Sequence, residues 1–79
     1  MEIHYSRQAK KFLLKQDRTT QRRLMEAIAK LPFSGDIKKL QGSDGYRLRV
    51  GNFRILFDVN GLIIDIIDIN SRGQIYKGV

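Results

Sequence analysis

Residues 46–57, YRLRVGNFRILF, combine three arginines with the pattern of a β-hairpin. Apolar and polar residues alternate on both sides of a Gly-Asn pair, which is a two-residue hairpin turn signal. With that pair as the loop, Arg49 lies directly opposite Arg54, and Arg47 shares their face of the sheet. Like charges facing each other across a ladder are destabilising. A concentration of positive charge on a rigid surface suits an anionic ligand, so the segment points to phosphate binding.

An ordinary solvated strand face is the alternative interpretation of these arginines, because the exposed face of an antiparallel sheet is normally polar. The opposed pair of Arg49 and Arg54 argues against that interpretation. Tyr76 could similarly be an amphipathic anchor, with a packed ring and a solvated hydroxyl group. His4 is the chain's only histidine and has no identifiable partner, so a surface or structural role is the simpler interpretation.

The charge of the chain indicates a polyanionic partner. The 79 residues carry a net charge of +7, and 42% of them are hydrophobic, as expected of one globular domain. Residues 1–40 hold ten Lys/Arg against four Asp/Glu, and residues 41–79 hold five against four, so +6 of the charge lies in the first half. Nucleic acid is the polyanion that best suits such a chain. A basic surface that only confers solubility is the alternative.

Several classes of site are not expected. The chain has no cysteine, and therefore neither a disulfide framework nor a thiolate metal site. Its aspartates are scattered and it has a single histidine, so neither a metal nor another cofactor is predicted. The first five residues lack the apolar region of a secretory signal, and the longest apolar stretch, 62–69, is too short to span a bilayer. These features predict a cytoplasmic protein without a membrane partner.

Periodicity predicts the elements that must hold the arginines in place. Ser6 is a helix cap for a first helix through Lys15, and Asp17 caps a second helix from Arg18 to Leu31. The remaining expected elements are a short strand at 3–5, a loop at 33–45, strands at 46–50, 53–59 and 62–69, and an extended piece at 74–77.

The Asn60-Gly61 pair predicts a second hairpin with a type I′ turn. Pairing across it sets Leu56 opposite Asp65 and Arg54 opposite Ile67, so Asp65 would share the arginine face and balance its charge near Arg47. The opposite face is predicted to form the core, with Tyr46, Leu48, Val50, Phe53, Ile55, Phe57, Val59, Leu62, Ile64 and Ile66.

The predicted architecture is therefore α+β, in the order β-α-α-β-β-β(β), within a single domain over residues 1–79. An antiparallel sheet is covered on one face by a two-helix hairpin. Its other face is open to solvent and carries the arginines.

This order of elements resembles the RelE/ParE toxin superfamily of bacterial type II toxin–antitoxin systems. The segment 46–54, YRLRVGNFR, and the later Ser71-Arg72 and Ile75-Tyr76 carry the resemblance, which covers nearly the whole chain. It implies either a RelE-like toxin that cleaves messenger RNA on the ribosome or a ParE-like toxin that poisons DNA gyrase. A cognate antitoxin is implied as partner in both cases.

The resemblance also implies site residues. Arg47 and Arg49 match two basic residues, often lysines, of RelE-like nucleases. Arg54 matches the arginine that starts the next strand. Arg72 and Tyr76 match the late arginine and tyrosine. ParE-like toxins commonly lack this complete set, so the match favours RNA cleavage. Many relatives have a histidine immediately before the late arginine, where this chain has Ser71, and the C-terminal helix of some members is missing.

Arginine forks match phosphate oxygens, so Arg47 and Arg54 are expected to clamp the transition state. Arginine is a poor base, because its pKa stays above about 12. Tyr76 is therefore the predicted general base, provided that neighbouring guanidinium groups favour its phenolate. Arg72 is expected either to stabilise the leaving oxygen or to assist its protonation. Further contacts with messenger and ribosomal RNA are expected from basic residues outside this set: Lys10, Lys11, Arg22, Arg23, Lys38 and Lys39.

The sequence thus predicts a metal-independent endoribonuclease acting in the ribosomal A site. A gyrase inhibitor without enzymatic activity and a basic RNA-binding module without activity remain as alternatives. The antitoxin is expected to be acidic where it meets the arginine face, because complementary charge speeds and orients association.

Overall fold

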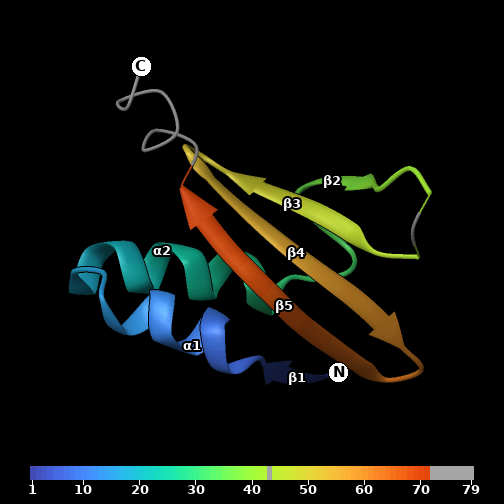
Figure 1. The fold of residues 1–79 in the computed structure, drawn as a ribbon, viewed down its shortest axis with the longest axis horizontal. Helices are drawn as coiled ribbons and strands as arrows, with labels where there is room; N and C mark the ends of the chain where they lie inside the picture. Colours follow the sequence, from blue (N-terminus) through green and yellow to red (C-terminus); the bar gives the residue numbers. More distant parts are fainter. Residues whose placement is uncertain (43, 72–79) are drawn as a thin grey trace.

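The computed structural model describes residues 1–42 and 44–71. In this part of the chain, five strands and two helices follow one another (Figure 1). They are β1 (Glu2–Tyr5), α1 (Arg7–Leu14), α2 (Arg18–Ala29), β2 (Asp36–Lys39), β3 (Tyr46–Val50), β4 (Phe53–Asn60) and β5 (Ile63–Ser71). The extended piece predicted at 74–77 lies outside the described residues.

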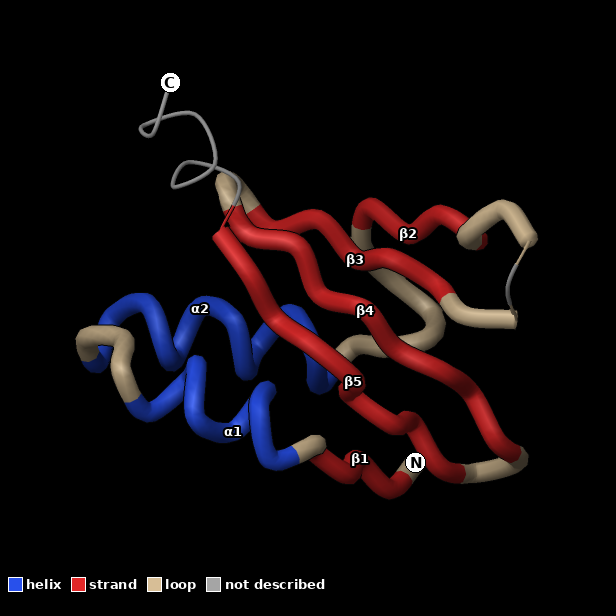
Figure 2. Tube along the Cα trace, viewed as in Figure 1, coloured by secondary structure: helices blue, strands red, loops and turns tan. Residues whose placement is uncertain are grey.

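The strands form one sheet in the order β1-β5-β4-β3-β2. Strands β2 to β5 pair antiparallel, whereas β1 pairs with β5 in parallel, with Glu2 opposite Ile63. The helices run side by side along one part of the sheet (Figure 2). The predicted α+β architecture is confirmed, but the sheet is mixed rather than wholly antiparallel. The helical crossover from β1 brings the first strand in parallel beside the last one.

Both predicted helix caps are present. The Ser6 hydroxyl accepts a hydrogen bond from the Ala9 N–H at 3.1 Å, and the Asp17 carboxylate accepts one from the Thr20 N–H at 2.9 Å. Each cap satisfies a backbone donor that the first helical turn leaves unpaired. Helix α2 ends at Ala29, two residues before the predicted end.

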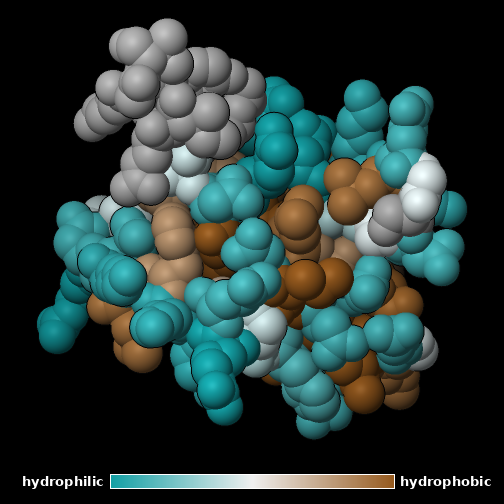
Figure 3. Space-filling model, in the orientation of Figure 1, coloured by the Kyte–Doolittle hydropathy of each residue, from teal (hydrophilic) through white to brown (hydrophobic). Residues whose placement is uncertain are grey.

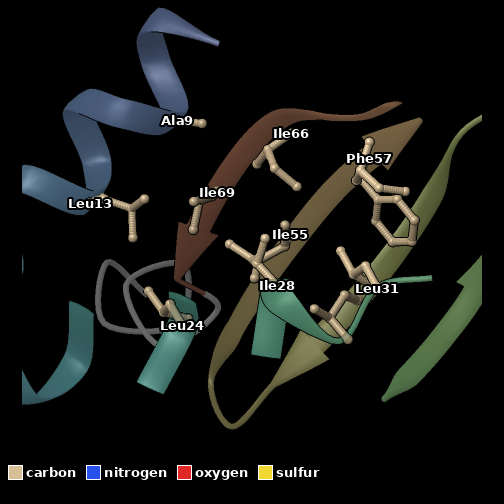
Figure 4. Close-up of a cluster of buried hydrophobic side chains, with 11 residues drawn as sticks. Ala9, Leu13, Leu24, Ile28, Leu31, Ile55, Phe57, Ile66 and Ile69 are labelled. Carbon is tan, nitrogen blue, oxygen red and sulfur yellow. The ribbon is translucent and has the colours of Figure 1, made fainter. Parts of the chain in front are cut away.

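The core lies between the helices and the sheet (Figure 4). Helical apolar stripes meet the alternating residues of three strands, and this burial is the main favourable term for a small domain. Its buried members are Ala9, Leu13, Leu24, Ile28, Leu31, Leu48, Ile55, Phe57, Ile64, Ile66 and Ile69. Val59 and Leu62, predicted to be in the core, are 36% and 77% exposed. Ile69 was not predicted and is 2% exposed.

Strand β2 lies within the segment predicted as a loop. It pairs antiparallel with β3, and Ile37 opposite Leu48 packs against the core. Its other residues, Asp36, Lys38 and Lys39, are charged and exposed. One apolar residue among three charges is too weak a pattern to predict a strand. Such charges are typical of edge strands, where they oppose pairing with another chain.

The turn between β4 and β5 also differs from its prediction. Gly61 and Leu62 form the loop, so Asn60 remains in β4 opposite Ile63. Gly61 has a φ of +61°, and no residue other than glycine has a positive φ among the described residues. A glycine with a positive φ as the first of the two loop residues fits a type II′ turn rather than the predicted type I′ turn. Asn60 is held in the strand by its side-chain amide, which donates to Asp65 Oδ2 at 2.8 Å.

A β-bulge at Ile67 changes the register further along this hairpin. Phe57 pairs with Ile66, whereas Leu56 pairs with Asp68. The extra residue allows both Ile66 and Ile69, three positions apart, to face the core. Leu56 is therefore not opposite Asp65, and Arg54 lies opposite Asn70 rather than the predicted Ile67.

The start of α1 holds this bulge. The Ser6 hydroxyl donates to the Ile67 carbonyl at 2.6 Å, and Gln8 Nε2 donates to the same oxygen at 3.0 Å. The Ser6 N–H donates to the carbonyl of Ile66 at 2.8 Å. One serine therefore caps the helix and satisfies the backbone of the irregular strand.

We expect Ser6→Ala to lower the free energy of unfolding by about 1–2 kcal/mol, since a helix cap and a hydrogen bond to the bulge are lost together. Urea denaturation measures the difference. Ser34→Ala is the matched control, because Ser34 is exposed and its hydroxyl takes no part in a helix cap. Equal stabilities of the two variants would contradict the role assigned to Ser6.

The cap of α2, Asp17, makes the stability of the protein depend on pH. Hydrogen bonding by Thr20, from its side chain and its backbone N–H, holds the pKa of Asp17 below its ordinary value of 3.8. The stability from this carboxylate is therefore complete above about pH 4 and is lost as the pH falls through the lowered pKa. Asp17→Asn keeps a capping side chain without a titrating group. Its unfolding free energy should fall less steeply than that of the parent below pH 4, and parallel curves would contradict the assignment.

Candidate functional site

The three hairpin arginines lie on one face of the sheet, as predicted. Val50 pairs with Phe53 across the Gly51-Asn52 turn, and Arg49 is directly opposite Arg54. Cβ atoms of opposed residues are about 4.5–5.5 Å apart, so two guanidinium groups start from neighbouring points. Arg47, two residues before Arg49, points to the same side.

Aromatic packing on the other face holds these strands. The rings of Phe12 in α1 and Phe53 in β4 meet edge to face, with centroids 6.0 Å apart. The rings of Tyr46 and Phe57, which are cross-strand partners, stack with centroids 5.4 Å apart. Such pairs contribute about 0.5–1.5 kcal/mol beyond the burial of their area. The arginines therefore project from a backbone whose underside is fixed to the core.

Burial of the arginines is uneven. The Arg47 side chain is only 13% exposed, whereas that of Arg49 is 42% exposed. The Nε atoms of Arg47 and Arg54 are buried and have no hydrogen-bond partner among the described residues. An unpaired buried donor costs about 1–3 kcal/mol, and more when it is charged. An anion that accepts from these nitrogens would remove that penalty.

One carboxylate approaches the arginines from β2. An oxygen of Asp36 lies 3.8 Å from Arg47 Nη2, and the other lies 4.0 Å from Arg49 Nε. Asp36 is 59% exposed and these distances are long, so its attraction is weak. Lys38, opposite Arg47 in the ladder, adds another cation to this face. The positive charge is therefore only partly balanced.

A surface hollow of about 370 Å³ lies beside the arginines. It is lined by Lys38, Lys39, Leu40, Gln41, Arg47 and Arg54. Strongly hydrophilic side chains stand over the region of β3 on the visible face, next to an apolar area in its centre (Figure 3). The two arginines with unpaired Nε atoms thus border a space large enough for a small anionic ligand.

Asp65 shares the arginine face, as predicted, but it does not lie in the row of Arg47 as the prediction had it. It lies opposite Asp58 on β4 and beside His4 on β1. The bulge at Ile67 instead puts Asp68 in the row of Arg47, two strands away across Leu56. Asp68 is therefore the β5 carboxylate in line with Arg47, whereas Asp58 and Asp65 lie further along the open face.

The other predicted nucleic-acid contacts divide into two groups. Lys38 and Lys39 border the hollow described above. Lys10, Lys11 and Arg22 are exposed on the helices, which pack on the opposite side of the sheet from the arginines.

Arg23 joins the helices to the arginine hairpin. A Cβ atom added to Gly51 would lie 2.5 Å from Arg23 Nη2, so this guanidinium group rests against the turn. Gly51 also has a φ of +57°, which side chains other than glycine rarely adopt. The positive φ favours a glycine here, whereas the flexible Arg23 side chain could move away from a Cβ atom, and positive charge extends from the arginine face to the end of the hairpin.

Arg72 and Tyr76 lie outside the described residues. The described chain ends at Ser71, which pairs with Phe53 at the start of β4. Asn70, the residue before it, is opposite Arg54. The roles expected of Arg72 and Tyr76 stay predictions.

His4 lies on β1, at the edge of the sheet opposite β2. Its Nε2 is 3.2 Å from Glu2 Oε1 and its Nδ1 is 3.9 Å from Asp65 Oδ1. Strand β5 lies between it and the arginine hairpin, which is formed by β3 and β4. In residues 1–42 and 44–71, no three His, Cys, Asp or Glu side chains group as a metal site. No helix of that part has the length and apolar character needed to cross a membrane.

Sequence reasoning missed three residues of the site. Asp36, Leu40 and Gln41 fall in the segment predicted as a loop, and no periodic pattern marks them. The edge position of β2 brings them to the arginines. A signal for Asp36 existed in the charge excess of β3, which favours a carboxylate on the neighbouring strand.

The mixed five-stranded sheet with two helices on one face matches the fold of RelE toxin structures. A chain of the RelB–RelE antitoxin–toxin complex from Methanococcus jannaschii is 29% identical, with a TM-score of 0.75 over 95% of this chain and 96% of that chain. A chain of the RelE–RelB complex from Pyrococcus horikoshii is 27% identical, with a TM-score of 0.77 over 92% of this chain and 96% of that chain. Isolated RelE from E. coli shares the fold at 18% identity, with a TM-score of 0.74 over 98% and 92%.

The family follows from the sequence profile that matches the chain. Residues 3–76 match the profile described as the ParE toxin of the type II toxin–antitoxin system parDE. The chain therefore belongs to this toxin family, within the RelE/ParE superfamily. Among curated proteins, none matches the sequence significantly.

The opposed arginines should oppose folding. We expect Arg49→Gln to raise the free energy of unfolding by about 0.2–1 kcal/mol at low salt, because a like-charge pair across the ladder is removed. The gain should shrink at about 0.5 M salt, where exposed charges are screened. Urea denaturation at both salt concentrations measures it.

Lys15→Gln is the control for this prediction, because it lowers the net charge equally at the exposed end of α1. If Lys15→Gln stabilised the protein as much as Arg49→Gln, general charge repulsion would account for the effect and the local pair would not.

Proposed function

We propose that this toxin is an endoribonuclease that cleaves messenger RNA in the ribosomal A site, and that it acts in the cytoplasm. The observation that carries the proposal is the pair of buried, unpaired Nε atoms of Arg47 and Arg54 beside Arg49. These groups are suited to bind a phosphodiester and to stabilise the additional negative charge of its transition state. The similarity to RelE structures is in keeping with this activity.

The proposed reaction needs no metal ion. The 2′-hydroxyl attacks the adjacent phosphorus, and the bond from phosphorus to the 5′-oxygen breaks, which yields a 2′,3′-cyclic phosphate and a 5′-hydroxyl. A base takes the proton of the 2′-hydroxyl, and an acid supplies one to the departing oxygen. Arg47 and Arg54 bind the non-bridging oxygens, and Arg49 adds positive charge at the same phosphate. Arg72 is assigned to the leaving oxygen.

Tyr76 is the proposed base. The chain has three tyrosines, and two of them have other roles. Tyr46 stacks on Phe57 beneath the sheet. Tyr5 packs against the core, and burial raises its pKa, which makes its phenolate harder to form. Guanidinium groups around Tyr76 would have the opposite effect and favour its phenolate.

Inhibition of DNA gyrase is the second candidate function, because the matching family profile is that of ParE toxins. Such a toxin would act by binding protein rather than by cleaving RNA. Its effect in cells would be DNA breaks with a damage response, whereas the nuclease would stop translation and leave cut transcripts.

The proposed protein partner is a cognate antitoxin. The relatives from Methanococcus and Pyrococcus were crystallised as complexes with RelB. Here the partly balanced charge of Arg47, Arg49 and Lys38 favours an acidic segment on the arginine face. A short acidic reading frame beside this gene would support the proposal.

Two variants test the nuclease. Arg54→Ala should slow cleavage about 10²–10³-fold, as expected when one donor to the transition state is removed. Tyr76→Phe should slow it about 10²–10⁴-fold if Tyr76 is the base. Primer extension on messenger in a translating extract, and on the same messenger alone, measures both rates and the dependence on the ribosome.

Lys15→Ala is the control for these variants, since Lys15 is exposed at the end of α1 and takes no part in the site. A parent protein that breaks DNA and leaves messenger intact would favour the gyrase candidate. A protein that binds RNA without either effect would be a binding module. Full activity of Tyr76→Phe would reject only the base assignment.

A further inference from the structure

The hollow beside the arginines has two different kinds of wall. Lys38 and Lys39 of β2, together with Arg47 and Arg54, make one side cationic. Leu40 and Gln41, which follow β2, supply an apolar side chain and a carboxamide. A simple inorganic anion would bind the cationic side and would not need an apolar side chain or a carboxamide beside it. The combination suits a ligand that carries both a phosphate and a polar, planar group.

The wall formed by Leu40 and Gln41 is attached to the sheet. The Leu40 N–H donates to the Gly45 carbonyl at 3.0 Å, immediately after β2 and before β3. Leu40 is half-buried, and Gln41 is exposed beside it. This hydrogen bond closes the connection between the two strands. The backbone of Leu40 is therefore held two residues beyond the row that contains Lys38 and Arg47, and Gln41 follows it directly.

The size and chemistry of the hollow fit one nucleotide. Its volume of about 370 Å³ lies within the range of about 300–1,000 Å³ typical of small-ligand sites. An RNA base presents a flat apolar surface and an edge with hydrogen-bond donors and acceptors. A leucine side chain can cover the surface, and a carboxamide, which both donates and accepts, can bind the edge.

We infer that this hollow binds the ribonucleotide next to the cleaved phosphate, with its base against Leu40 and Gln41 and its phosphate on Arg47, Arg54 and Lys38. The inference rests on the proposed function, because it places the scissile phosphate at the arginines. Gln41 is then a specificity residue, which favours particular bases without taking part in the reaction. The toxin would contribute to the choice of cleavage site through its own side chains.

Nuclear magnetic resonance can test binding to the purified protein. Nucleoside 3′-monophosphates with each of the four bases are titrated in turn, and inorganic phosphate is titrated separately. Both kinds of ligand should shift the Nε–H signals of Arg47 and Arg54. Only the nucleotides should shift the backbone N–H signals of Leu40 and Gln41. Identical shifts with phosphate and nucleotides, or no shift at all, would overturn the inference.

Gln41→Ala sharpens the test. It should weaken the best-bound nucleotide about fivefold or more, since a good contact to a base edge discriminates by about 1–3 kcal/mol. Binding of inorganic phosphate should not change. Thr19→Ala, on the exposed side of α2, is the matched control and should leave both affinities as they are. Unchanged nucleotide binding by Gln41→Ala would refute the proposed contact between Gln41 and the base of the nucleotide.

Cleavage assays separate this inference from the proposed function. Compared with the parent protein, the Gln41→Ala variant should distribute its cuts differently among codons, while its total rate of cleavage remains within a fewfold of the parent rate. Cleavage of messenger with an unchanged distribution in Gln41→Ala would leave the nuclease standing and reject the nucleotide site. Nucleotide binding as expected in a protein that does not cut messenger would reject the nuclease and retain the site.

Discussion

Repulsion between Arg49 and Arg54 is the constraint around which the sheet is organised. The two side chains face each other across a tight turn, and exposed Asp36 compensates them only weakly. Packing on the other face holds the strands together. Phe53 contacts Phe12 of α1 there. Because the buried hydrophobic side chains of the described residues lie on the helix side, the open face is free to carry charge that a core could not accept.

The arginine hairpin was predictable because a two-residue turn fixes the pairing of both strands at once. The second hairpin was not, since Gly61 could be the first or the second residue of a turn and the two choices move the register by two residues. The bulge at Ile67 could not be read from alternation either. It depends on hydrogen bonds from Ser6 and Gln8, which are about sixty positions away in the sequence.

The same reasons explain which residues of the site could be predicted from the sequence and which could not. Arg47, Arg49 and Arg54 follow from local pairing, and their shared face was predicted correctly. Asp65 was misplaced because its position depends on the second hairpin. The hollow depends on β2, whose only apolar residue is Ile37, so Leu40 and Gln41 had no pattern to indicate them. Long-range pairing at a sheet edge determines these residues, and the sequence of the edge strand alone carries little information about it.

The parallel pairing of β1 with β5 has a consequence for synthesis of the protein. The first strand finds its partner only when residues 63–66 have left the ribosomal exit tunnel. Until then α1 and α2 have no complete sheet to cover, and Phe12 has only part of its final surroundings. Contacts between segments so far apart in the chain form late. The arginine face therefore acquires its rigid support only after residues 63–66 have emerged.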